Sequence, residues 1–393
     1  MTDIRSRVVA VLNREKPDRL PFCTRLEIWH RGLQRTGRLP PEFADTPLLA
    51  IHKQVKTGQE KYFNIHHMRL HGVEIRARLN GVEYFHEKDP VVDTFPRMYS
   101  LVDFEKPGIT DIDVITPKGT LRVRHKMLQS MVDDGIHPYL DITPVKDASD
   151  FPAFEYIIEN ARFVYRFEEY RQLQAEFGAL GYVVPVTERT PFQQLLIDCV
   201  GEVPLFYMLH DEPALFDRLI TLLDAKLMEA LQGLASFDGQ LVEFLDNLES
   251  QMTNPKLFRT HCLPYYQKYA DLMHGFGLKV GSHTDGNLKP LLGLLRETGL
   301  DVCESISPQP LTALTFDEVW RAWKDGPIIW GGIPSPILDA RTSDSAFHAF
   351  VDHLFGLIDE PRIILGVADM VLPSNAIDRV RQIAERADSF SFA

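Results

Sequence analysis

The residues with the clearest chemical potential lie in the last third of the chain, where short apolar runs end in polar side chains. These polar residues are Asp246, Asn247, His283, Asp285, Glu304 and Asp369. Histidine and carboxylate side chains can transfer protons, and several of them around one pocket can form an enzyme site. We therefore predict that Asp246, His283 and Glu304 are catalytic and that Asn247 contacts the substrate.

The apolar runs and the segments between them predict the element that positions these side chains. The runs occupy residues 241–245, 278–282, 301–303, 327–330 and 362–368. Helical spacing marks residues 256–274, 288–298 and 343–358. Buried strands that alternate with amphipathic helices are typical of a parallel sheet. Because the polar residues follow the strands, we predict an α/β fold, a (β/α)8 TIM barrel with its site at the C-terminal ends of the strands.

Two further strands are predicted in the first half of the chain, at residues 22–26 and 182–186. Trp29 and Glu188 follow these strands and are predicted to bind substrate. Trp330 is a further candidate for substrate binding, although the Gly331-Gly332 pair after it also fits tight closure of the barrel.

A change of periodicity marks an insertion in the N-terminal third. Asn80-Gly81 joins two segments with two-residue alternation, as expected for a tight hairpin turn, and a second hairpin is predicted at 114–124. The flanking regions 31–60 and 148–178 are predicted to be mainly helical. We therefore predict one barrel domain over residues 1–393, with a β-rich hairpin insertion at about 70–130.

Composition and charge limit the classes of function. The formal net charge is −13, with 45% hydrophobic and 25% charged residues, and no basic block offers a nucleic-acid surface. No run of about 18 apolar residues predicts a membrane span, and the N-terminus lacks the apolar stretch of a signal peptide. The cysteines, Cys23, Cys199, Cys262 and Cys303, are scattered, as is typical of reduced thiols. We expect a cytoplasmic protein with no nucleic-acid or membrane partner.

Several segments resemble the uroporphyrinogen decarboxylase (URO-D)-like superfamily. They are residues 5–21, 246–248, 264–266, 281–291, 330–334 and 365–373. The resemblance covers nearly the whole chain outside 70–130, and the order and spacing of the segments are more specific than any single one. It implies a (β/α)8 barrel with one of two activities. One is cofactor-free decarboxylation of a tetrapyrrole tetracarboxylate, and the other is methyl transfer to or from a corrinoid, usually with zinc.

The chain departs from the pattern of the decarboxylase branch. That branch has an Arg-x-x-x-Arg loop for propionate groups, but here Gln34 precedes Arg38, and residues 63–69 replace the expected aspartate motif. A histidine on the last strand is replaced by Asp369. Binding a substrate with several carboxylates requires converging Arg or Lys side chains, and no such cluster is visible. Arg38 is kept as a predicted substrate-binding residue.

The chain also departs from the zinc site of the methyltransferase branch. The resemblance implies a His-x-Cys motif and a later Cys, but here Asp285 and Asp369 occupy the two cysteine positions beside His283. Carboxylates in place of thiolates make a harder site. A divalent metal such as zinc is therefore either held weakly by His283, Asp285 and Asp369, or is not bound. In the second case these groups act in proton transfer on the leaving oxygen of a methyl ether.

From this resemblance we predict a methyltransferase that moves a methyl group between a small methylated substrate, such as a methyl ether, and a corrinoid. No corrinoid-binding module is evident, so we expect a partner protein to carry the corrinoid. For the oligomeric state of the protein itself, we consider a homodimer. Decarboxylation by a URO-D-type lyase and a non-catalytic ligand-binding barrel are the alternatives. Individual residues also have structural alternatives: Asp285 could cap the following helix, and Asp246-Asn247 could hydrogen-bond neighbouring loops.

Overall fold

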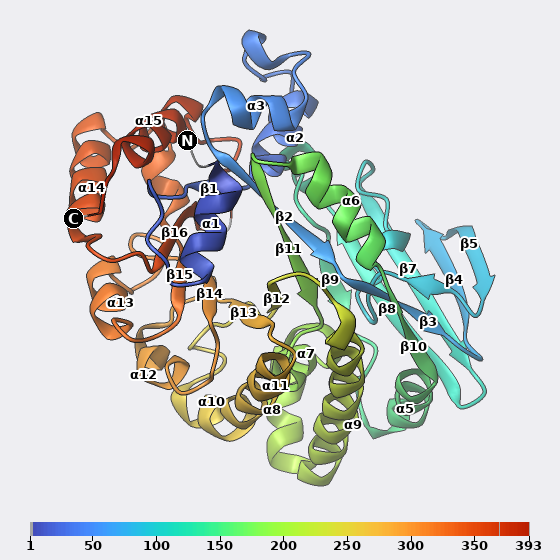
Figure 1. Cartoon of the computed structure of the whole chain (residues 1–393). Coiled ribbons are helices and arrows are strands. Elements are labelled where there is room, and N and C mark those ends of the chain that lie inside the picture. The colour runs from blue at the N-terminus through green and yellow to red at the C-terminus, as the bar shows by residue number, and fades with distance from the viewer. Residues whose placement is uncertain (1–2, 369, 393) are drawn as a thin grey trace. The chain divides into compact units, whose positions relative to one another are not determined.

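Eight parallel strands form a nearly closed barrel in the computed structural model of the protein, which describes residues 3–368 and 370–392 (Figure 1). In their order around the sheet the strands are β1 (Cys23–Thr24), β2 (Gly58–Asn64), β11 (Gly181–Thr187), β12 (Leu241–Phe244), β13 (Lys279–His283), β14 (Val302–Ile306), β15 (Ile328–Ile333) and β16 (Ile363–Val367). A parallel bridge between Phe22 and Leu365 links the first strand to the last. The predicted (β/α)8 fold is confirmed.

Helices follow the strands on the outside of the barrel. They are α1 (Ile4–Leu12), α2 (Glu27–Arg35), α3 (Leu48–Gln54), α6 (Phe167–Phe177), α10 (Pro255–His261), α11 (Leu263–Gly275), α12 (Leu292–Leu295), α13 (Phe316–Ala322), α14 (Asp344–Leu357) and α15 (Ile377–Ser389). Local sequence sets several of their ends. Thr315 and Glu318 form a capping box at α13, and Asn254 caps α10 with its side chain.

The barrel interior is apolar at the end where the strands begin. Val8, Val11 and Leu12 of α1 join one buried cluster with inward-facing residues of the strands. Those residues are Cys23, Tyr182, Val184, Val186, Leu241, Val302, Ile328, Trp330 and Ile364. Because α1 also contacts Ala179 just before β11, it covers the N-terminal ends of the strands. Any ligand therefore has to approach from the C-terminal ends.

The described residues divide into two compact units. The barrel unit comprises residues 1–63, 168–186 and 239–393, and the second unit comprises 64–167 and 187–238. The second unit contains two antiparallel sheets, in the order β5-β4-β7-β8-β9 and β10-β3-β6. Its strands are β3 (His66–Leu70), β4 (Glu74–Leu79), β5 (Val82–Lys88), β6 (Val91–Val92), β7 (Gly108–Thr116), β8 (Gly119–Met127), β9 (Tyr139–Ile142) and β10 (Ala161–Tyr165). Its helices are α4 (Gln129–Asp134), α5 (Phe151–Asn160), α7 (Pro191–Gln194), α8 (Glu202–Asp211) and α9 (Pro213–Gln232).

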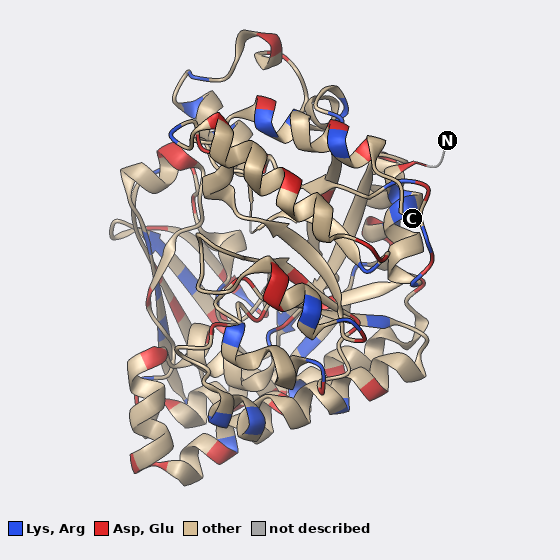
Figure 2. Ribbon diagram, turned by 90° about the vertical axis from the view of Figure 1, so that its left-hand side faces the viewer, with Lys and Arg blue, Asp and Glu red and all other residues tan. Residues whose placement is uncertain are grey.

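Both predicted hairpins form in the second unit. β4 pairs with β5 across Asn80 and Gly81, which both have positive φ, and β7 pairs with β8. Acidic and basic residues lie on neighbouring strands of this sheet (Figure 2). Asp113 pairs with Arg78 and Arg122 across neighbouring strands. Such cross-strand ion pairs fix the register of strands whose outer face meets water.

Three secondary-structure predictions are wrong in part. Residues 31–60 include the start of β2, whose sequence is too polar to be recognised as a barrel strand. Residues 148–178 include β10 between two helices, and the helix predicted at 288–298 shrinks to α12 with a preceding 3-10 turn. In the first two cases tertiary pairing determines the strand, since the local pattern is ambiguous.

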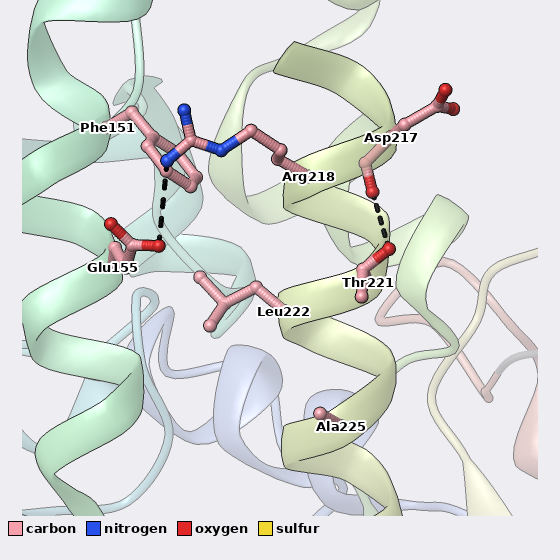
Figure 3. A pocket seen from close by; sticks show the side chains of 7 residues that line it. All are labelled: Phe151, Glu155, Asp217, Arg218, Thr221, Leu222 and Ala225. Carbon is pink, nitrogen blue, oxygen red and sulfur yellow. Dashed lines mark hydrogen bonds and ion pairs between the residues drawn. The ribbon is translucent and has the colours of Figure 1, made fainter. Parts of the chain in front are cut away.

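A shallow groove of about 450 Å³ lies between α5 and α9 of the second unit (Figure 3). Arg218 lies 4.2 Å over the Phe151 ring at this groove and 3.7 Å from Glu155.

Among the helices of the described residues, none combines the length and hydropathy that a bilayer crossing requires.

Candidate active site

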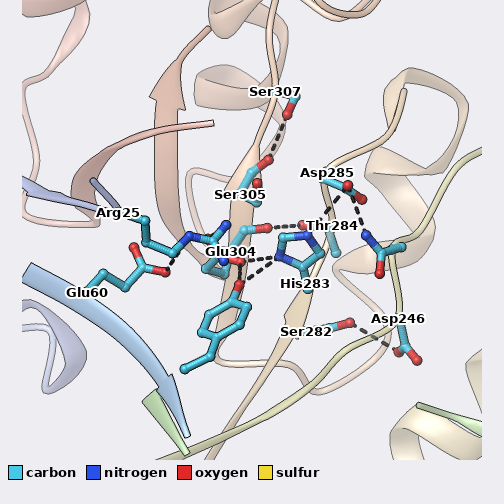
Figure 4. A network of polar contacts seen from close by, with 12 residues as sticks. Arg25, Glu60, Asp246, Ser282, His283, Thr284, Asp285, Glu304, Ser305 and Ser307 are labelled. Carbon is cyan, nitrogen blue, oxygen red and sulfur yellow. Dashed lines mark hydrogen bonds and ion pairs between the residues drawn. The ribbon is translucent and has the colours of Figure 1, made fainter. Parts of the chain in front are cut away.

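A hydrogen-bonded group of three side chains lies inside the barrel unit, on β2, β13 and β14. His283 and Glu304 are register partners on β13 and β14, and Glu304 Oε2 lies 2.5 Å from His283 Nδ1 (Figure 4). The Tyr62 hydroxyl, from β2, donates to the same Glu304 oxygen and lies 2.8 Å from His283 Nδ1. His283 and Glu304 are at most 4% exposed. Two residues predicted from the sequence are therefore brought together.

The two-residue alternation of the strands explains why these polar groups point inward. Val302 belongs to the apolar interior, so Glu304, two positions later on β14, faces the same side. Cys303 faces the other side, where its thiol contacts Thr284. Cys303 and Glu304 therefore face opposite sides of β14.

Contacts among these side chains determine their charges and outweigh the effect of burial. Burial lowers the pKa of His283, but Glu304 and Asp285 outweigh it and hold the pKa well above its usual value. Burial raises the pKa of Glu304, but His283, Arg25 and the Tyr62 hydroxyl bring it below its usual value. Despite burial, His283 and Asn247 lower the pKa of Asp285 to about 2. The site therefore holds an imidazolium ion between two carboxylates at neutral pH.

Two more carboxyl groups lie in the same interior. Glu60 on β2 and Glu243 on β12 are 3% and 0% exposed. Burial, together with the charge of Glu304, raises the pKa of both well above the usual range and so favours their protonated forms. Among the described residues, the two carboxyl oxygens of Glu243 have no hydrogen-bond partner. The Oε1 atom of Glu60 likewise has no hydrogen-bond partner among them.

Arg25 is the cation that faces these carboxyl groups. Its guanidinium lies 3.8 Å from Glu60 Oε1, 3.9 Å from Glu304 Oε1 and 4.4 Å from the centre of the Tyr62 ring. One guanidinium thus lies within 4 Å of two carboxyl groups, Glu60 and Glu304.

Asp246 and Asn247 follow β12 and have different surroundings. The Asp246 carboxylate accepts hydrogen bonds from the Tyr266 hydroxyl and from Ser282 Oγ at 3.1 Å, and it is fully buried. Asn247 donates to Asp285 at 3.0 Å, and Asp285 lies 3.5 Å from His283 Nε2. Asn247 is therefore joined to the His283 group through Asp285, while Asp246 contacts a helix of the barrel wall. The catalytic role of Asp246 stays a prediction.

The other predicted substrate-binding residues are spread through the fold. Trp29 is buried on α2 and donates to the Asn375 carbonyl, and Trp330 packs in the barrel core. Arg38 is exposed and bonds Thr36. Glu188 belongs to the second unit. Their predicted roles stay predictions, and Asp369 lies outside the described residues.

The donor set for a metal was tested against the geometry of His283. Both of its nitrogens face carboxylates, at 2.5 and 3.5 Å, and a protonated imidazole has no lone pair for a metal. Within residues 3–368 and 370–392, no group of three or more His, Cys, Asp or Glu side chains has the arrangement of a metal site. The described residues alone do not make up a metal site, and the third predicted ligand, Asp369, lies outside them.

Sequence reasoning missed Arg25, Glu60, Tyr62 and Glu243. Glu60 and Tyr62 were missed together with their strand. Glu243 had a usable signal, because it is a carboxylate in the middle of the apolar run 241–245. Such a residue is either paired or protonated in the interior, since an isolated buried carboxylate is costly.

Gly281 makes room for Glu243, and this leads to a stability prediction. A Cβ atom at Gly281 would lie 2.7 Å from Glu243 Cγ, in a barrel interior that cannot easily expand. We expect Gly281→Ala to lower the free energy of unfolding by about 1–3 kcal/mol, as measured by urea denaturation. Gly356→Ala on α14, where the added Cβ meets nothing within 4 Å, should instead raise it by about 0.5–1 kcal/mol. Equal effects of the two substitutions would contradict this account of Gly281.

Comparison with protein families gives one match in the C-terminal half. Residues 198–390 match the family model described as Uroporphyrinogen decarboxylase (URO-D). These residues include β12 to β16, and therefore His283 and Glu304. Comparison with curated proteins finds no match to this chain.

Comparison with solved structures supports the fold. A methyltransferase from Methanosarcina mazei is similar over 99% of both chains, with a TM-score of 0.57 and 14% identity. A putative vitamin-B12 independent methionine synthase from Listeria monocytogenes matches 56% of this chain and 68% of its own, with a TM-score of 0.34 and 14% identity. Ribulose-1,5-bisphosphate carboxylase/oxygenase from Pyrococcus horikoshii matches 60% of this chain and 47% of its own, with a TM-score of 0.30 and 11% identity. The last two scores are too low to carry a conclusion.

Proposed function

Since the chain belongs to the uroporphyrinogen decarboxylase (URO-D)-like superfamily, we propose that it is a methyltransferase. It moves a methyl group between a small methylated substrate, such as a methyl ether, and a corrinoid carried by a partner protein. The likeness to the Methanosarcina mazei methyltransferase over nearly the full length of both chains supports the choice of this activity.

The observation that carries the proposal is the position of His283 between two carboxylates, Glu304 and Asp285, which favour its protonated form. An alkoxide or phenolate is a poor leaving group, so cleavage of a methyl ether requires a proton donor at the departing oxygen. Glu304 holds His283 Nδ1 at 2.5 Å, whereas the contact of Nε2 with Asp285 is longer, at 3.5 Å. The Nε2 proton is therefore the one that passes to the departing oxygen.

The remaining residues orient and charge the imidazole. Glu304 stabilises the imidazolium, the Tyr62 hydroxyl fixes the Glu304 oxygen, and Asn247 holds Asp285 beside Nε2. The corrinoid, when bound, supplies the nucleophile that accepts the methyl group as the carbon–oxygen bond breaks. The interior of the barrel keeps water from the proton donor.

The test is a methyl-transfer assay with the purified chain, free cob(I)alamin and a panel of aryl and alkyl methyl ethers. Using free cob(I)alamin removes the need to identify the partner protein. We expect the cobalamin absorbance to change with a methyl ether present, and demethylated product to form in equal amount. Release of carbon dioxide from uroporphyrinogen without a corrinoid would instead favour decarboxylation. Binding of a methyl ether without either reaction would favour a ligand-binding barrel.

The metal content of the purified protein distinguishes a metal-dependent version of the proposed reaction from a metal-free one. Zinc or another divalent ion on His283, Asp285 and Asp369 stays a prediction from the resemblance, and we expect any such ion to be held weakly. Elemental analysis before and after dialysis against a chelator checks it. Stoichiometric zinc that survives prolonged chelation would contradict weak binding.

A further inference from the structure

A second group of buried charged residues lies in the second unit. Asp198, within a π-helical turn at Leu195–Cys199, accepts a hydrogen bond of 3.0 Å from Arg189 Nε. The same carboxylate oxygen lies 3.6 Å from Arg97 Nε. Two guanidinium groups are therefore directed at one aspartate, and the side chains of Asp198 and Arg189 are 4% and 6% exposed.

The guanidinium of Arg97 makes no hydrogen bond to the described part of the chain. Its side chain is 12% exposed. Among the described residues its contacts are the 3.6 Å ion pair with Asp198 and a position 5.7 Å from the Tyr99 ring centre. Neither contact is a hydrogen bond, although a guanidinium carries five N–H donors. Because the Arg97 side chain is partly exposed, these donors are open to an acceptor that a ligand supplies.

Glu188 supplies a second group without a partner. It is 5% exposed, and within the described residues its Oε1 atom has no hydrogen-bond partner. Burial raises the pKa of Glu188 to about 8, even though Arg97 and Arg189 oppose the rise. At neutral pH its carboxyl group is protonated and can donate a hydrogen bond, as can Arg97.

We propose that Arg97 and Glu188 form a binding site for a small organic carboxylate, with Arg189 and Asp198 holding the site in place. The planar guanidinium donates two parallel hydrogen bonds to the two oxygens of the ligand, which is the geometry in which arginine binds carboxylates. The Glu188 carboxyl donates a third. This site belongs to the second unit alone, and it does not depend on the proposed methyl transfer.

The proposal is tested by titrating benzoate and acetate into the full-length protein at pH 7 and constant ionic strength, followed by saturation-transfer NMR. We expect saturable binding that Arg97→Gln weakens at least about tenfold, since hydrogen bonds to charged groups contribute about 1.5–3 kcal/mol. Arg218→Gln is the matched control, because it removes an exposed arginine of the same unit (Figure 3), and it should leave the affinity unchanged. Circular dichroism of both variants checks that they fold.

A second measurement uses the titration of Glu188. Arg97, Asp198, Asp93 and Arg189 are the charged groups around it. Tyr99 and His125 adjoin Arg97, but the pKa of Tyr99 is raised above 10 and that of His125 is lowered to about 4, so neither titrates between pH 7 and 9. As pH rises through 8, Glu188 becomes a carboxylate that competes for Arg97 and repels the ligand. Affinity should fall in the wild type and stay constant in Glu188→Gln.

Four results would overturn the proposal. The first is absence of saturable binding of both carboxylates. The second is equal binding by wild type and a folded Arg97→Gln variant. The third is the same pH dependence of binding in wild type and Glu188→Gln. The fourth is inorganic phosphate binding as tightly as benzoate, which would show that the site does not select the planar carboxylate.

Discussion

Replacing His283 with glutamine should lower the rate of methyl transfer to cob(I)alamin by about 10²–10⁴-fold, the contribution typical of a positioned proton donor. The loss should be largest for alkyl methyl ethers and smallest for aryl ethers whose phenol is acidic, because a stable phenolate departs without a proton. A spectroscopic assay over such a series measures both effects. His274→Gln is the matched control, since His274 is on α11 and pairs with Asp301 through an exposed contact.

The pH profile gives the same prediction a second readout. The wild-type rate should fall as pH rises through the pKa of His283, which lies above its usual value. Glu304→Gln removes the largest influence that raises this pKa, so the fall should move to lower pH. A His283→Gln variant that keeps the wild-type rate and pH profile would show that the imidazole is not the proton donor.

Replacing Glu243 with glutamine should stabilise the protein above about pH 5, by an amount that grows with pH. Burial and the charge of Glu304 keep this carboxyl protonated in the folded barrel, whereas the unfolded chain releases the proton above the usual pKa of 4.5. The folded state thus binds more protons, so wild-type stability falls as pH rises from 4.5 towards the folded pKa. The expected fall is about 1 kcal/mol per pH unit, and a neutral amide removes it.

Urea denaturation of both proteins at several pH values between 5 and 8 measures this difference. Glu318→Gln is the control, because contacts with Lys289 and Thr315 lower the pKa of Glu318 to about 2. Glu318 is ionised in the folded state throughout this range, so its replacement should not change the slope of stability against pH. Parallel slopes for wild type and Glu243→Gln would mean that the buried carboxyl is not held in its protonated form.

The sequence predicts most of the barrel strands and some of the site residues. The strand and the site residues that it does not predict were missed for the same reason. Strands such as β16 are apolar on both faces and are evident from composition alone. β2 has the sequence GQEKYFN, and its inward residues Glu60 and Tyr62 are polar because they contribute to the site. A strand that places a carboxyl and a phenol in the interior lacks the apolar pattern by which strands are recognised.

The pairing of side chains was less predictable than their position. The runs that end in His283 and Glu304 predict that both reach the carboxyl ends of the strands. Their direct contact depends on the register between β13 and β14, which is fixed by backbone hydrogen bonds. Asp246 also follows a strand, but its carboxylate binds Tyr266 on α11. Strand position therefore identifies candidates, and side-chain partners separate them.

The first helix of the chain also constrains how the protein is made. Val8, Val11 and Leu12 share one buried cluster with Val302, Ile328 and Ile364, which the ribosome adds about 290 to 356 residues later. Until β14 to β16 emerge, α1 has no complete surface to cover, and its apolar side remains in water. Contacts so distant in sequence slow folding and prolong the exposure of apolar surface. Nascent chains of this protein should therefore need protection from aggregation until synthesis is nearly complete.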